Sequence, residues 1–157
     1  MDEPSFRTAT AADLPRVLAL IADGAIAAPG PPAPDAPATL PPEARHEAAF
    51  AAIESDANHV PLLLEVDGLV VGYVQVSFLP GLSRGGAWRG QLETVRVAST
   101  HRGRGLGGLL LERAVELCRE RGCALVQLTS DARREDARRF YEAHGFVASH
   151  RGLKRTL

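Results

Sequence analysis

The most informative part of the sequence is Arg102-Gly103-Arg104-Gly105-Leu106-Gly107-Gly108, which joins a β-patterned segment to an amphipathic helix. Glycine lets consecutive backbone N–H groups turn toward one point, and the start of a helix adds its partial positive charge there. The pattern therefore predicts a binding site for a phosphate group. The alternative is a glycine-rich turn that only starts a helix, although such a turn needs neither four glycines nor two arginines.

The charge of the chain is divided unevenly between its halves. Residues 1–80 carry 3 basic and 11 acidic side chains, whereas residues 81–157 carry 15 basic and 8 acidic ones. The half that contains the glycine-rich stretch is thus positive, as expected for a part that receives a polyanion. An aromatic fraction of 5% and a net charge of −1 argue against nucleic acid and favour a small phosphate-bearing ligand.

Length and composition are typical of one globular domain that spans residues 1–157. The chain is 45% hydrophobic and 24% charged, and no apolar run approaches the length of a membrane span. The first residues are acidic, where a secretory signal would be basic and then apolar. We therefore expect a cytoplasmic protein without a membrane partner.

Two cysteines, Cys118 and Cys123, are too few for a disulfide framework or a four-ligand zinc site. We interpret both as small buried hydrophobic residues, with a catalytic thiol as the alternative. The five histidines show no metal-ligand spacing, so we predict no metal cofactor.

Hydrophobic periodicity and turn signals predict an α/β fold whose mixed, mostly antiparallel sheet is covered by helices on both faces. Asp67-Gly68 is a strong hairpin signal, and a right-handed crossover would make Cys123 to Thr129 parallel to Gln91 to Val97. The expected strands are Phe6 to Ala9, Val60 to Val66, Leu69 to Phe78, Gln91 to Val97, Cys123 to Thr129 and a terminal strand or hairpin from Phe146. The first expected helix begins after Asp13, which would cap it. Three further helices are expected over Glu43 to Asp56, Gly105 to Arg121 and Arg133 to Ala143. Long loops are expected at Ala27 to Pro42 and Pro80 to Gly90.

A dinucleotide site is a rival interpretation of the same glycines. Gly103, Gly105 and Gly108 satisfy the G-x-G-x-x-G pattern, and Asp131 follows after a further strand. In that fold, however, the strand runs directly into the first glycine and several more βα units follow. Here residues 98–102 intervene and only 49 residues remain after Gly108, so we regard the match as coincidental.

Three segments together resemble the GNAT superfamily of acyl-CoA-dependent N-acetyltransferases. They are Leu92-Glu93-Thr94-Val95-Arg96-Val97, the pattern Arg102-x-x-Gly105-x-Gly107, and Phe140-Tyr141-Glu142-Ala143-His144-Gly145-Phe146. The resemblance covers nearly the whole chain and implies a GNAT-like sheet whose one parallel pair is splayed apart. It also leaves a homodimer open.

The resemblance implies coenzyme A, as acetyl-CoA, for the phosphate site. Backbone groups of Val95 and Val97 would then pair with the pantetheine arm as if it were another strand. Arg102 and Arg104 would attract the phosphates, and the main-chain amides of the stretch would hold the pyrophosphate. These amides belong to Gly103, Arg104, Gly105, Leu106, Gly107 and Gly108.

Acetyl transfer needs an acceptor for the proton of the amine, and Glu93 is the candidate base. Strand alternation puts Glu93 on the same face as Val95 and Val97, where its carboxylate would be partly desolvated, unless a bulge changes the facing. The alternative is an ordinary glutamate at a strand edge.

The resemblance assigns Tyr141 as the donor of a proton to the coenzyme sulfur and the amide of Val95 as the donor to the thioester oxygen. A buried core tyrosine is the alternative for Tyr141. Many family members have Asn where this chain has Arg134, so one polar contact to the coenzyme arm is expected to differ. His101 and His144 are interpreted as solvated loop residues.

The function predicted on this basis is transfer of an acetyl group from acetyl-CoA to a primary amine by direct attack in a ternary complex. The alternative in another class is a non-catalytic acyl-CoA sensor of the same fold. The sequence does not identify the acceptor: small amines, amino acids, aminoglycosides and protein N-termini all stay open.

Overall fold

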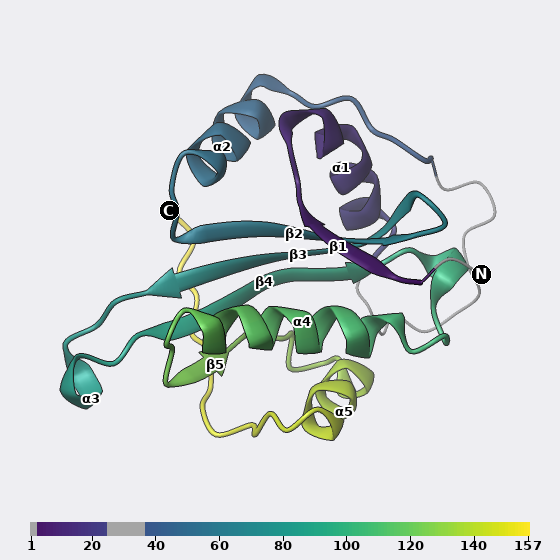
Figure 1. The fold of residues 1–157 in the computed structure, drawn as a ribbon. Helices are drawn as coiled ribbons and strands as arrows, with labels where there is room; N and C mark the ends of the chain where they lie inside the picture. Colours follow the sequence, from purple (N-terminus) through teal and green to yellow (C-terminus); the bar gives the residue numbers. More distant parts are fainter. Residues whose placement is uncertain (1–2, 25–36) are drawn as a thin grey trace.

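The computed structural model describes residues 3–24 and 37–157, and its centre is a five-stranded sheet in the order β1-β2-β3-β4-β5 (Figure 1). Neighbouring strands are antiparallel except β4 and β5, which are parallel, so the predicted mixed sheet with one parallel pair is confirmed. The strands are β1 (Ser5–Thr8), β2 (His59–Val66), β3 (Leu69–Leu79), β4 (Arg89–Val97) and β5 (Leu125–Gln127).

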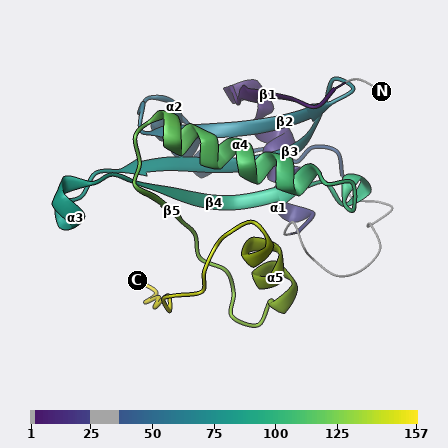
Figure 2. The same ribbon diagram turned by 60° about the horizontal axis from the view of Figure 1, so that its bottom comes forward.

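Helices cover both faces of this sheet, as the sequence predicts (Figures 1 and 2). They are α1 (Leu14–Ala22) and α2 (Ala44–Glu54) on one face and α4 (Leu106–Glu120) and α5 (Glu135–Ala143) on the other. Three short helical turns are also present: η1 (Ala11–Asp13), α3 (Ser83–Gly86) and η2 (Ser99–His101). Successive leucines of β2 show the two cores, since Leu63 packs with α1 whereas Leu62 and Leu64 pack with α4.

The hairpin predicted at Asp67-Gly68 joins β2 to β3. Both residues have positive φ, 52° and 75°, as a two-residue turn of the type favoured in hairpins requires. The long strand β3 that follows contributes buried residues to both cores and lies at the centre of the sheet.

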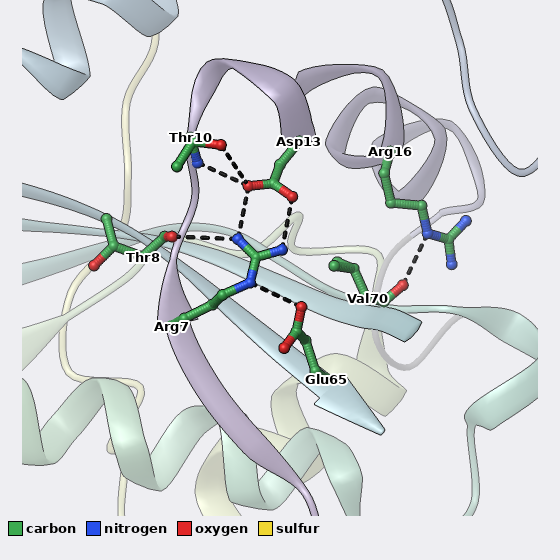
Figure 3. Close-up of polar contacts among 7 residues, drawn as sticks. All are labelled: Arg7, Thr8, Thr10, Asp13, Arg16, Glu65 and Val70. Carbon is green, nitrogen blue, oxygen red and sulfur yellow. Dashed lines mark hydrogen bonds and ion pairs between the residues drawn. The ribbon is translucent and has the colours of Figure 1, made fainter. Parts of the chain in front are cut away.

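Arg7 ties β1 to its neighbours (Figure 3). Its guanidinium donates two hydrogen bonds to the Asp13 carboxylate, at 2.7 and 2.8 Å, and one to Glu65 of β2, at 2.8 Å. The Arg7 guanidinium lowers the pKa of Asp13 from 3.8 to about 2. Asp13 occupies the N-cap position of α1, as predicted, but its side chain forms no cap hydrogen bond there. Its carboxylate accepts instead from Arg7 and from the N–H of Thr10.

A β-bulge in β4 changes the facing of the residues that follow it. In the ladder with β3, Glu93 pairs with Gln75 and Arg96 with Tyr73, so Thr94 and Val95 share the space opposite one residue. Thr94 has φ of 59°, a left-handed conformation that suits a bulge. Leu92, Val95 and Val97 are all buried in the α4 core, and Glu93 is exposed.

Two expectations for the chain after the glycine-rich stretch differ from the structure. The strand expected over Cys123 to Thr129 forms only from Leu125 to Gln127, because the chain then leaves β4. The terminal strand or hairpin expected from Phe146 is wrong, since residues 146–157 contain no strand. They have no partner at the sheet edge, where β5 ends after three residues.

The proline-rich loop expected at Ala27 to Pro42 lies outside the described residues as far as residue 36. From residue 37 onward its end docks on α1. The N–H of Leu40 donates to the carbonyl of Pro15, and Arg16 donates to the carbonyls of Ala38 and Val70. Figure 3 shows the contact of Arg16 with Val70.

Candidate active site

The glycine-rich stretch forms a bend that leads into α4. Gly103 and Gly105 have φ of 74° and 76°, which side-chain-bearing residues rarely adopt. Gly105 is the N-cap of α4 without a side chain to cap the helix, and the N–H of Leu109 is the first to bond back, to the Gly105 carbonyl at 3.2 Å. The N–H groups from Gly103 to Gly108 donate to no acceptor among residues 3–24 and 37–157.

Arg102 anchors this bend to the rest of the fold. Its guanidinium donates to the carbonyls of Val97 at 3.2 Å, Asp23 at 3.0 Å and Gly24 at 3.3 Å. The bend is therefore attached both to the end of β4 and to the end of α1. Arg104, in contrast, is exposed.

A cleft opens where β4 and β5 separate. The two strands pair only at Arg89, Gly90 and Gln91 of β4. Beyond these residues a cavity of about 250 Å³ lies between β4 and the segment that follows β5. Splaying of the parallel pair, expected from the resemblance, is therefore present. The cavity is lined by Leu92, Glu93, Thr94, Val95, Arg96, Leu128, Thr129, Ser130, Asp131, Arg134, Ala137, Tyr141 and Lys154.

The edge of β4 that faces the cleft has backbone groups without a strand partner. Beyond Gln91 no residue of β5 pairs with β4. The carbonyl of Val97 accepts from Arg102, and the carbonyl of Val95 accepts from Nη1 of Arg96 at 3.0 Å. Each carbonyl keeps a second lone pair for a ligand along this edge.

Tyr141 forms part of the cleft wall. Its ring packs edge-on against Phe140 and Phe146, with centroid separations of 5.2 and 5.8 Å. Its hydroxyl forms no hydrogen bond to a described residue. Burial raises the pKa of Tyr141, and the charges of Arg96 and Arg134 act in the opposite direction. The phenol is thus held in its protonated form beside the cavity.

Glu93 also lines the cleft, but its expected facing is wrong. Because of the bulge at Thr94, its side chain lies on the face opposite to Val95 and Val97. It is exposed and accepts a hydrogen bond from the Gln91 amide at 3.4 Å. The desolvation expected from strand alternation is therefore missing.

Two cationic side chains, Arg96 and Arg134, line the cleft together. The sequence did not predict that they would lie close to each other. Nε of Arg96 and Nη2 of Arg134 are buried and have no hydrogen-bond partner in the part of the chain that the structure describes. The pKa of Arg96 is lowered, first by burial and then by the charge of Arg134. The sequence shows Arg134 where many family members have Asn. The proximity of Arg134 to Arg96, however, depends on the fold.

His144 is not a solvated loop residue, contrary to expectation. Its Nδ1 donates to the carbonyl of Phe140 at 2.8 Å, and its ring lies 4.6 Å from that of Phe140. A Cβ on Gly108 would lie 2.8 Å from Nε2 of His144. Glycine at position 108 therefore lets the end of α5 contact the first turn of α4.

The two cysteines lie outside the cleft. Cys118 is buried in the α4 core, as predicted, and burial raises the pKa of its thiol to about 12. Among the described residues, no group of three His, Cys, Asp or Glu side chains is arranged to hold a metal ion. No helix in the described ranges is long and apolar enough to cross a membrane.

The parallel pair that opens into a cleft and the glycine-rich start of α4 are both features that the resemblance to acetyltransferases implies. The family model described as acetyltransferase (GNAT) family matches residues 30–146, and the chain belongs to this family.

Two curated proteins and one solved structure are similar to this chain. The chain is 37% identical over 87 residues to a glucosamine 6-phosphate N-acetyltransferase of Trypanosoma brucei brucei, which is 55% of this chain and 57% of that protein. It is 35% identical over 102 residues to an aminoalkylphosphonate N-acetyltransferase of Salmonella typhimurium, or 64% and 65% of the two chains. The crystal structure of a transcriptional regulator from Bacillus halodurans C-125 is 37% identical with a TM-score of 0.85, covering 99% of this chain and 100% of that one.

Proposed function

We propose that this chain is an acetyl-CoA-dependent N-acetyltransferase that acts on a small primary amine by direct attack in a ternary complex. The observation that carries the proposal is the cleft between β4 and β5, which has a protonated tyrosine in its wall. The bend between β4 and α4 adds unpaired backbone amides. Membership of the acetyltransferase (GNAT) family supports it.

The residues around the cleft fit coenzyme A. Six consecutive N–H groups, from Gly103 to Gly108, have no described acceptor and adjoin a helix N-terminus, which suits a pyrophosphate. The unpaired edge of β4 at Val95 and Val97 suits an amide-bearing arm. Exposed Arg104 adds attraction, whereas Arg102 acts mainly by holding the bend in place. Bound acetyl-CoA would supply the acetyl group as a thioester.

The chain supplies proton transfer and polarisation around that thioester. Glu93, exposed in the cleft, accepts the proton of the incoming amine directly or through water. The amide of Val95 polarises the carbonyl to be attacked, and the Tyr141 hydroxyl donates a proton to the departing sulfur. The three groups all line one cavity.

Direct attack is favoured over an acetyl-cysteine route by the position of the thiols. Cys118 is buried outside the cavity lining, and a thiol with a pKa of about 12 is almost entirely protonated near neutral pH. Cys123 is also absent from the cavity lining. Initial-velocity lines that intersect would agree with a ternary complex, and parallel lines would contradict it.

The acceptor is proposed to be a small molecule. The two curated relatives are named for a phosphorylated amino sugar and for aminoalkylphosphonates. The chain spans less than two thirds of either relative, so their names support only the class of acceptor: an amine on a small molecule.

A regulatory role is the second candidate, and one observation favours it. The structure with a TM-score of 0.85 is named as a transcriptional regulator. A protein of this fold that binds acyl-CoA without transfer would fit the same cleft.

One experiment separates the two. The protein is incubated with acetyl-CoA and a panel of primary amines, and the products are detected by mass spectrometry. Acetylated product from any acceptor at an appreciable rate rejects the non-catalytic role. Calorimetry with coenzyme A tests the step common to both, and no binding at millimolar concentration would reject both.

A further inference from the structure

The cleft contains a charge arrangement that the proposed transfer chemistry does not require. Two guanidinium nitrogens, Nε of Arg96 and Nη2 of Arg134, are buried without a hydrogen-bond partner in the described chain. Buried donors in native proteins are nearly always paired, and leaving one unpaired is energetically costly. An arrangement with this cost calls for a ligand that supplies the acceptors.

The acidic side chains of the cleft do not supply them. Asp131 is bound by Arg133, through Nη2 at 2.7 Å and Nε at 3.0 Å. Glu93 accepts from the Gln91 amide. Neither Arg96 nor Arg134 forms an ion pair with an acidic residue in the described ranges. Lys154 lines the same cavity and adds a third cation.

The two arginines come from different elements, β4 and the residue before α5, and meet at the cavity wall. Mutual repulsion contributes to the lowered pKa of Arg96, so their charges lie close to each other. An oxyanion between two guanidiniums removes the repulsion and accepts several charge-assisted hydrogen bonds. Both donors lie beside Tyr141, and therefore beside the proposed point of transfer.

We infer that Arg96 and Arg134 bind an oxyanion carried by the acceptor, so that this chain selects primary amines bearing a phosphate, phosphonate or carboxylate group. The inference rests on the proposed transferase function. It adds the residues that choose the acceptor and the charge that the acceptor must carry.

Matched acceptors test the selection. 2-Aminoethylphosphonate and β-alanine are compared with neutral 3-amino-1-propanol, and glucosamine 6-phosphate with glucosamine. For at least one pair we expect a kcat/KM at least about tenfold higher for the anionic member, because each charge-assisted bond contributes a factor of roughly 10 to 100. The comparison between members also shows which oxyanion is used. Equal kcat/KM within every pair would overturn the inference while leaving the transferase proposal intact.

Variants then assign the selection to the two arginines. Arg96→Gln and Arg134→Gln should each lower the ratio of kcat/KM for the preferred anionic acceptor over its neutral partner by about 10- to 100-fold. The matched control is Arg139→Gln, on the same helix as Tyr141 but exposed and outside the cavity, and it should leave the ratio unchanged. An unchanged ratio with weakened coenzyme A binding would mean that the arginines serve the coenzyme, and would refute the inference.

Direct binding tests the anion site even without turnover. Calorimetry of the protein saturated with coenzyme A should show 2-aminoethylphosphonate, β-alanine or glucosamine 6-phosphate binding to the unmodified chain at least about tenfold more tightly than to Arg96→Gln. If no acceptor is acetylated but this difference is found, the transferase proposal fails and the anion site stands. If no anionic amine binds better than its neutral partner, the anion site fails.

Discussion

Gly108→Ala tests how the start of α4 and the end of α5 are coupled. Alanine is favoured over glycine inside a helix by about 0.5–1 kcal/mol, so helix propensity alone predicts a more stable protein. The added methyl would lie 2.8 Å from Nε2 of His144, however. The His144 ring is held by its 2.8 Å bond to the Phe140 carbonyl and by contact with the Phe140 ring. Displacing it costs about 1–3 kcal/mol, so we expect a net loss of about 1 kcal/mol.

A double-mutant cycle with His144→Ala isolates this contact. Without the imidazole, the same Gly108→Ala change should stabilise the protein by about 0.5–1 kcal/mol, giving a coupling energy of about 2 kcal/mol. Thermal unfolding of the four proteins measures it, and 1 kcal/mol corresponds to about 2–4 °C for a chain of this length. A coupling below about 0.5 kcal/mol would show that His144 moves aside freely, and would refute the predicted clash.

Three further changes test the cleft, the bend and the N-terminal ion pair. Tyr141→Phe should lower kcat by about 100-fold and leave coenzyme A affinity within about twofold, as removal of a general acid predicts; unchanged kcat would exclude that role. Gly105→Ala forces a side chain into φ of 76°, at a cost of about 1–2 kcal/mol, and should weaken coenzyme A binding in calorimetry about tenfold, with Gly152→Ala as the control. Asp13→Asn should remove about 1 kcal/mol of stability at pH 7, an amount reduced by the 39% exposure of Arg7. Because the folded pKa of Asp13 is about 2, against 3.8, this contribution is present above about pH 4 and lost as pH falls toward 2, where chemical denaturation of the two proteins should converge.

The glycine-rich stretch and the hairpin were predictable because each is encoded by adjacent residues. Asp67-Gly68 needs only two residues with positive φ, and its turn appears as predicted. Gly103 and Gly105 likewise adopt the left-handed φ that a bend toward a helix start uses. Splaying of β4 from β5 followed from the family resemblance rather than from any local pattern.

The facing of Glu93 was not predictable from alternation alone. One residue in a left-handed conformation, Thr94, shifts the register of β4 and moves Glu93 to the opposite face from Val95. Nothing in a threonine within a strand-like segment signals such a conformation. The proximity of Arg96 to Arg134 depends in the same way on tertiary structure, since the two are 38 positions apart in the chain.

The two arginines also bear on the acid proposed for the transfer step. Burial raises the pKa of Tyr141, whereas the positive charges of Arg96 and Arg134 lower it. An anionic acceptor held by both guanidiniums would offset their charge, so the phenol would keep its proton more firmly once the acceptor is bound. A neutral amine leaves the arginine charges in place. The alkaline limb of the kcat profile, measured in the ternary complex, should therefore lie at higher pH with an anionic acceptor than with its neutral partner. A limb at the same pH for both would mean that Tyr141 does not sense the acceptor's charge.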